Sequence, residues 1–120
     1  MLLRPRADEE PFLTKDGAII RELMHPARHG NLHQSLAEAT VLPGRATTLH
    51  RHHKAEELYH CTAGRGLVTV GDEELPFAAG DTVAIPPGTP HRLRNPGPEP
   101  LVVLCCCSPP YAHEDTELLA

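Results

Sequence analysis

The chain has 120 residues, 40% of them hydrophobic and only 3% aromatic, and a formal net charge of -5. This length fits one domain with a modest hydrophobic core. The basic residues are scattered singly, which argues against nucleic acid as a partner. No segment approaches the roughly 20 apolar residues of a membrane span, and the first ten residues lack the apolar region of a signal peptide. We therefore expect a cytoplasmic protein that contacts neither a membrane nor nucleic acid.

The front of the chain is predicted to hold two short strands, Pro11–Leu13 and Ala18–Met24. Residues 25–34 follow as an irregular loop that contains His25, His29 and His33. These histidines could cap a binding site, but a solvated loop is the favoured interpretation.

Short strands divided by turns fill the rest of the chain, and no helical period stands out after residue 40. Gly71, Asp72 and Glu73 form a predicted hairpin turn between two of these strands. Many short strands at this spacing predict an all-β sandwich or barrel in a single domain. The predicted strands are Leu36–Val41, Ala46–His53, Glu57–Thr62, Leu67–Val70, Glu74–Phe77, Asp81–Ile85, His91–Arg94 and Leu101–Cys107.

Strand alternation places a group of possible metal ligands on one side. His50 and His52 are two residues apart and project to the same face, while Arg51 points the other way. Glu57 and His91 begin two later strands, so all four side chains can converge on one ion if they point into one barrel. His53 is the alternative to His52, and Glu56 the alternative to Glu57, but parity and spacing disfavour both.

Imidazole and carboxylate ligands suit Fe, Mn, Co, Ni, Cu or Zn. Four protein ligands on a six-coordinate ion leave about two positions for water, oxygen or substrate, which distinguishes a working metal from a structural one. We expect one divalent transition metal, with Fe or Mn favoured and Zn, Ni, Co or Cu as alternatives.

The spacing of these residues resembles the two motifs of the cupin superfamily. The first motif runs from Gly44 through the histidine pair and Glu57 to Gly64, and the second runs from Gly80 through Pro86 and Gly88 to His91 and Asn95. The chain resembles small single-domain bacterial cupins over about the last two-thirds of its length. The resemblance implies a double-stranded β-helix, or jelly-roll barrel, that is usually dimeric, with metal ligation by His50, His52, Glu57 and His91. It does not specify a reaction, because the superfamily includes dioxygenases, isomerases, decarboxylases and proteins without catalysis.

On this basis we divide the chain into three parts. Residues 1–34 form N-terminal strands and a loop that complete the barrel or a dimer interface. Residues 35–107 form the cupin barrel core. Residues 108–120 form a tail that folds over the barrel or onto a partner subunit.

Two further features of the predicted barrel have open interpretations. Tyr59 shares the face of Glu57, so it either positions a substrate or donates a proton near the metal, or it is a core residue. In the run Cys105, Cys106 and Cys107, neighbouring side chains point to opposite faces, which suits reduced thiols better than disulfides. Both faces of that strand are apolar, so parity does not decide which thiol points inward. Buried hydrophobic filler is favoured over a thiol near the metal.

Three functional hypotheses follow from this site. The favoured one is a metalloenzyme that acts on a small molecule by oxygenase-like chemistry, because few inward acid–base groups are visible. The second is a metal-dependent isomerase or lyase, and the third is a non-catalytic protein that binds a small molecule or a metal. A homodimer is expected, because small barrels leave sheet edges that a partner subunit can cover.

Overall fold

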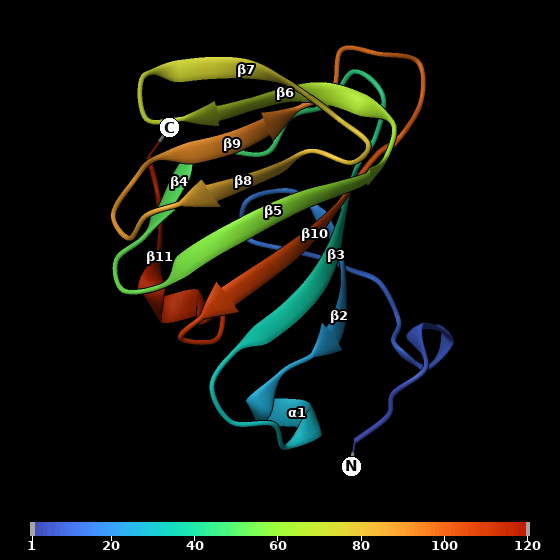
Figure 1. Cartoon of the computed structure of the whole chain (residues 1–120), viewed down its shortest axis with the longest axis vertical. Helices are drawn as coiled ribbons and strands as arrows, with labels where there is room; N and C mark the ends of the chain where they lie inside the picture. Colours follow the sequence, from blue (N-terminus) through green and yellow to red (C-terminus); the bar gives the residue numbers. More distant parts are fainter. Residues whose placement is uncertain (1, 120) are drawn as a thin grey trace.

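The computed structural model describes residues 2–119, which fold into two antiparallel β-sheets (Figure 1). The strands are β1 (Phe12–Leu13), β2 (Ile19–Met24), β3 (Ser35–Val41), β4 (His50–His52), β5 (Glu56–Ala63), β6 (Arg65–Val70), β7 (Glu73–Ala78), β8 (Thr82–Ile85), β9 (His91–Arg94), β10 (Leu101–Ser108) and β11 (Thr116–Leu118). The six-stranded sheet has the order β1-β2-β3-β10-β5-β8, and the five-stranded sheet has the order β11-β4-β9-β6-β7. This architecture confirms the predicted all-β fold.

Alternating burial explains why these segments form strands that close on one core. Along β5, Glu57, Tyr59 and Cys61 are buried, while Leu58 is 41% exposed. Both sheets contribute side chains to the hydrophobic core between them. The core residues are Val41, Tyr59, Cys61, Val68, Phe77, Ile85, Leu93, Leu101 and Val103.

The chain reverses tightly between β6 and β7, as the sequence predicts. Gly71 there has φ of +61°, a left-handed conformation that glycine adopts without a steric penalty. Pro76 lies in β7, which is an edge strand of its sheet, so the missing N–H of proline breaks no interior ladder.

Two segments differ from their predicted structure. The predicted strand Ala46–His53 shortens to β4, because the backbone before it bonds elsewhere: Thr47 N–H donates to Leu93 and Thr48 N–H donates to Asp16. The predicted loop 25–34 contains a one-turn helix, α1 (Pro26–His29). His25 caps this turn through its side chain and proline occupies the first turn, but one turn is too short to show periodicity.

The C-terminal tail folds back and joins the five-stranded sheet of its own chain. It forms a short 3-10 turn, η2 (His113–Asp115), and then β11, which pairs antiparallel with β4. A further 3-10 turn, η1 (Arg6–Asp8), lies near the start of the chain. Within residues 2–119 the helical segments are single turns, and none has the length and apolar character of a membrane-crossing helix.

Candidate metal centre and pocket

The four predicted metal ligands meet between the two sheets. His50 and His52 come from β4, Glu57 from β5 and His91 from β9. One ligand atom from each residue lies within 4.8 Å of every other, and none of the four residues is more than 5% exposed. Such a group of three imidazoles and one carboxylate could hold one transition-metal ion.

Strand parity accounts for this convergence. Between the two histidines of β4, Arg51 points outward and forms an ion pair with Glu117 at 2.9 Å. On β9, Arg94 points away from His91 and forms an ion pair with Glu74 at 2.9 Å. The prediction that Arg51 turns away from the ligands is confirmed.

The hydrogen bonds of the imidazole rings indicate that a cation fits this group. His50 Nδ1 lies 2.7 Å from the Thr48 carbonyl oxygen, and His91 Nδ1 lies 2.9 Å from the Thr89 carbonyl oxygen. A carbonyl oxygen only accepts, so both Nδ1 atoms donate, and in the neutral rings Nε2 carries a bare lone pair. His91 Nε2 nevertheless faces Glu57 Oε1 at 3.0 Å. Only a proton on the ring or a cation shared between the two atoms relieves this contact.

The other two ligands are oriented by β11 and β10. His52 Nδ1 lies 3.0 Å from the hydroxyl oxygen of Thr116, and this hydroxyl donates to the Ala112 carbonyl at 3.0 Å, so it accepts from His52. The thiol of Cys107 donates to Glu57 Oε2 at 3.3 Å. Outer partners of this kind fix the orientation of metal ligands and raise their basicity.

Local electrostatics favour a charged carboxylate beside neutral thiols. Burial is the largest influence on Glu57 and opposes its ionisation, but the hydrogen bonds and charges of His52 and His91 together outweigh it and lower its pKa to about 2. Burial, followed by the charge of His91, lowers the pKa of His50. Burial, followed by the charge of Glu57, raises the pKa of Cys107. A carboxylate that stays ionised near neutral pH suits a divalent cation.

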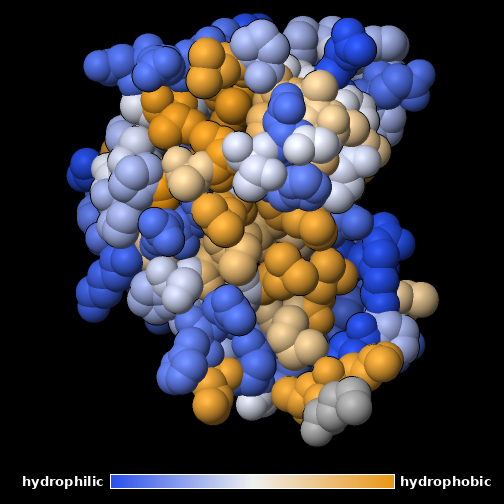
Figure 2. Space-filling view, viewed as in Figure 1, coloured by the Kyte–Doolittle hydropathy of each residue, from blue (hydrophilic) through white to orange (hydrophobic). Residues whose placement is uncertain are grey.

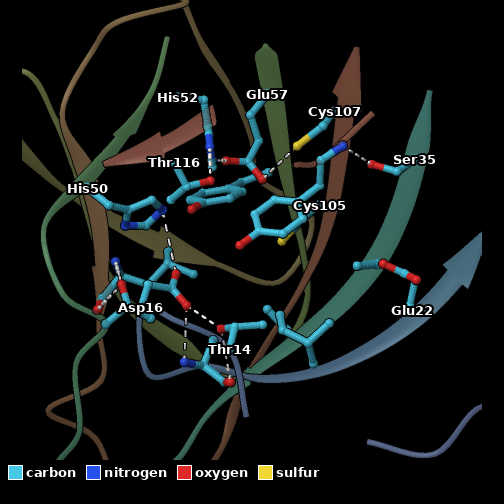
Figure 3. Close-up of a pocket in the computed structure, with 18 of the residues that line it drawn as sticks. Thr14, Asp16, Glu22, Ser35, His50, His52, Glu57, Cys105, Cys107 and Thr116 are labelled. Atoms are coloured by element: carbon cyan, nitrogen blue, oxygen red, sulfur yellow. Dashed lines mark hydrogen bonds and ion pairs between the residues drawn. The ribbon is translucent and has the colours of Figure 1, made fainter. Parts of the chain in front are cut away.

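A pocket lies beside the ligand group, and small side chains form its floor (Figure 3). On β3 and β10, Ser35 pairs with Cys107 and Ala37 pairs with Cys105, so short side chains leave space above the sheet. Cys106 points instead toward Gln34. The remaining lining residues come mainly from β1, β2, the turn between them and the tail; they include Phe12, Asp16, Ile20, Glu22, Tyr59, Tyr111 and Thr116.

This arrangement resolves the open question about the cysteine run. Cys105 and Cys107 line the pocket, and Cys106 lies on the opposite side of the strand. The favoured interpretation as hydrophobic filler is wrong for Cys107, because its thiol donates to a predicted metal ligand.

Tyr59 lines the same pocket and is 3% exposed. Its ring meets that of His91 edge-on, with 5.7 Å between the ring centroids. Burial raises the pKa of its hydroxyl, which therefore stays protonated and can donate a hydrogen bond. Its catalytic role stays a prediction.

Asp16 is a site residue that the sequence did not reveal. It lies in the turn between β1 and β2, and its Oδ2 is 3.5 Å from His50 Nε2, on the side of the ring that faces the other ligands (Figure 3). The turn is held in place because Thr48 N–H donates to the Asp16 carbonyl at 2.7 Å and Ala18 N–H donates to its side chain at 3.3 Å. An aspartate before a glycine predicts a turn, but no local pattern says that the turn reaches the histidines.

The remaining histidines lie outside the ligand group. His53 is an exposed partner of Glu117 at 3.0 Å, and His60 bonds to the hydroxyl of Thr82, so neither side chain points toward the ligand group. The prediction of a solvated loop is wrong for His29, which is buried and contacts Glu9. This contact connects α1 to the N-terminal segment, a long-range pairing that spacing alone does not show.

Together, the two facing sheets and the buried three-histidine, one-glutamate group define a class of small β-sandwich proteins with a candidate metal centre. The sequence profile of the cupin domain family matches residues 37–107, and the chain belongs to the cupin family. The uncharacterized protein MJ1618 of Methanocaldococcus jannaschii is 53% identical over 110 residues, which cover 92% of this chain and 88% of MJ1618.

Solved structures show the same fold. A Cupin 2 conserved barrel domain protein from Salinispora arenicola is similar with a TM-score of 0.75 and 27% identity, over 89% of this chain and 87% of that one. A putative sugar phosphate isomerase from Acidithiobacillus ferrooxidans is similar with a TM-score of 0.70 and 26% identity, over 83% of this chain and 67% of that one.

Proposed function

We propose that this chain binds one divalent transition-metal ion through His50, His52, Glu57 and His91 and acts as a metalloenzyme on a small molecule. The observation that carries the proposal is the contact between His91 Nε2 and Glu57 Oε1 in a buried group whose Nδ1 atoms are already committed as donors. Fe or Mn is the favoured ion, and Zn, Ni, Co and Cu are the alternatives. A bound ion would supply Lewis-acid activation at its open positions.

Asp16 favours acid–base chemistry over oxygenase-like chemistry. The expectation of an oxygenase depended on a scarcity of inward acid–base groups. Asp16 supplies a carboxylate 3.5 Å from His50 Nε2, and Tyr59 supplies a buried hydroxyl in the same pocket. A carboxylate beside a Lewis acid is the combination that an isomerase or lyase uses to move a proton. The likeness to a putative sugar phosphate isomerase is consistent with this reaction class.

We also propose a homodimer formed through the outer face of the six-stranded sheet. Leu58 on β5 is 41% exposed there, and Val102, Leu104 and Cys106 of β10 are partly exposed beside it. Figure 2 shows apolar side chains gathered along the middle of the molecule in the view in which β5, β10 and β3 lie in front. A contiguous apolar patch on a sheet is typical of a subunit interface.

A cytoplasmic location is proposed on the state of the cysteines. All four are free thiols, although three of them are consecutive. This is the state expected in a reducing compartment.

Metal analysis tests the proposed function. Untagged protein purified without chelator is expected to contain near-stoichiometric metal by elemental analysis, and His52→Ala is expected to lose it. Arg51→Ala is the matched control, because Arg51 lies on the same strand but pairs with Glu117 outside the site. Stoichiometric metal in a folded His52→Ala protein, or none in the reconstituted wild type, would contradict the proposal.

A further inference from the structure

The ionisable side chains that line the pocket beside the histidines include carboxylates but no lysine or arginine among the described residues. The carboxylates are those of Asp16, Glu22 and Glu57. The ammonium group of Lys15, which is next to Asp16 in the chain, donates a hydrogen bond to the Thr116 backbone carbonyl at 2.9 Å. Of the three carboxylates, Glu57 alone is accounted for as a metal ligand, so Asp16 and Glu22 give the pocket two additional negative charges.

Glu22 lies at the end of the pocket opposite the histidines (Figure 3). The strand register connects it to the site in a single row, since Glu22 pairs with Ala37, Ala37 with Cys105, and Cys105 with Tyr59. Three strand steps of about 4.8 Å separate the two ends of this row by roughly 14 Å. Because Ala37 and Cys105 are small, the space above them is open, and the pocket runs between the ligand group and Glu22.

Two polar groups in this pocket lack a partner within the described part of the chain. The Glu22 carboxylate, which is partly buried, forms no hydrogen bond or ion pair with any residue between 2 and 119. The Tyr59 hydroxyl, on a residue that is 3% exposed, likewise forms no hydrogen bond to residues 2–119. Within residues 2–119, neither group is among the fully enclosed polar atoms that lack a partner, so both are reached from the pocket and are open to pairing with a ligand.

The balance of charge follows from these groups. A divalent ion bound by the single carboxylate of Glu57 has a net charge of one positive unit. The carboxylates of Asp16 and Glu22 change the net charge of ion and pocket together to one negative unit. A phosphate or carboxylate substrate would therefore find no net positive charge at the metal end of the pocket and would meet repulsion at Glu22. A positively charged group near Glu22 would meet an unpaired carboxylate.

We propose that the pocket selects a cationic small molecule, such as an amino alcohol, with an oxygen donor directed toward the ion, Asp16 and Tyr59 and an ammonium group directed toward Glu22. This inference rests on the proposed metal site. It departs from the sugar phosphates suggested by one structural relative, because it requires the opposite charge on the ligand.

Matched probes that differ only in charge test the proposal. Metal-loaded protein is titrated by calorimetry with 5-amino-1-pentanol, 1,5-pentanediol and 5-hydroxypentanoate, which carry an ammonium, a hydroxyl and a carboxylate at the same place. We expect the aminoalcohol to bind most tightly and the hydroxy acid most weakly. Glu22→Gln should weaken binding of the aminoalcohol by about tenfold and leave the diol unchanged. Glu73→Gln, an exposed site in the β6–β7 hairpin that removes the same charge, is the control.

The outcomes separate this inference from the proposed function. If the hydroxy acid binds most tightly, or Glu22→Gln leaves the affinity for the aminoalcohol unchanged while the protein holds its metal, the inference is overturned and the metal site stands. If the protein binds no metal at all, the proposed function fails first. Failure of the aminoalcohol to bind metal-loaded protein at millimolar concentration also overturns the inference.

Discussion

The contact between the C-terminal tail and the metal centre gives a quantitative prediction. Thr116→Val keeps the shape of a buried side chain that is 5% exposed but removes its hydroxyl. The change deletes the acceptor for His52 Nδ1 at 3.0 Å and the bond donated to Ala112 at 3.0 Å. His52 then either buries an unpaired Nδ1–H or moves its proton to Nε2, where it blocks the metal.

The expected size of this effect follows from the lost hydrogen bond. A buried donor without a partner costs about 1–3 kcal/mol. Each 1.4 kcal/mol or so is a factor of ten in affinity, so metal affinity should fall by roughly 10–100-fold. The loss should affect the ion more than the fold, because Thr116 lies in a three-residue edge strand.

Competition with a chelator of known affinity measures the effect directly. The matched control is Thr62→Val, which removes an exposed hydroxyl that bonds to the Val102 carbonyl on the outer side of the sheet. We expect Thr62→Val to bind metal like the wild type. Equal metal affinity in Thr116→Val and the wild type would refute the assignment of the tail as an orienting partner of His52.

Two further predictions concern pH and assembly. The metal-free protein should lose stability as the pH falls below about 6.5 and again below about 4.5. The reason is that the pKa values of His50 and Glu57 are lowered in the folded state, so the unfolded chain takes up those protons first. Thermal melts across this pH range measure the effect, and a melting temperature that rises on acidification would contradict the predicted sign. Leu58→Glu should convert the proposed dimer to a monomer in light scattering, whereas Leu75→Glu, on the edge strand β7 and 47% exposed, should leave the proposed dimer intact. A wild-type protein that is monomeric at micromolar concentration would disprove the interface.

The placements that the sequence predicted correctly are those that follow from local alternation along a strand. His50, His52, Glu57 and His91 each lie on a strand with a clear inner face, so their spacing was sufficient to bring them together. The cysteine run shows where alternation fails, because both faces of β10 are apolar and only its pairing with β3 and β5 shows which thiols point inward.

The residues that the sequence did not reveal depend on contacts between distant segments. Asp16 reaches His50 across 34 positions of sequence, and Thr116 reaches His52 across 64. Neither is specified by a periodicity within its own segment: the first lies in a turn and the second in a strand of three residues. The short helix α1 was missed for a related reason, since its caps are local but its single turn leaves no repeat to detect.

The origin of the pocket walls has a consequence for how such proteins diversify. All four candidate ligands lie within residues 37–107, the part that matches the cupin domain profile, whereas Asp16, Glu22, Tyr111 and Thr116 lie before or after it. The segment that matches the profile therefore supplies the candidate ion-binding group, and the flanking segments supply part of the pocket wall beside it. Exchange of the flanks between relatives is expected to alter ligand preference while leaving the candidate ion-binding group intact, so the ends of cupins, as well as their motifs, bear on the transfer of substrate assignments between them.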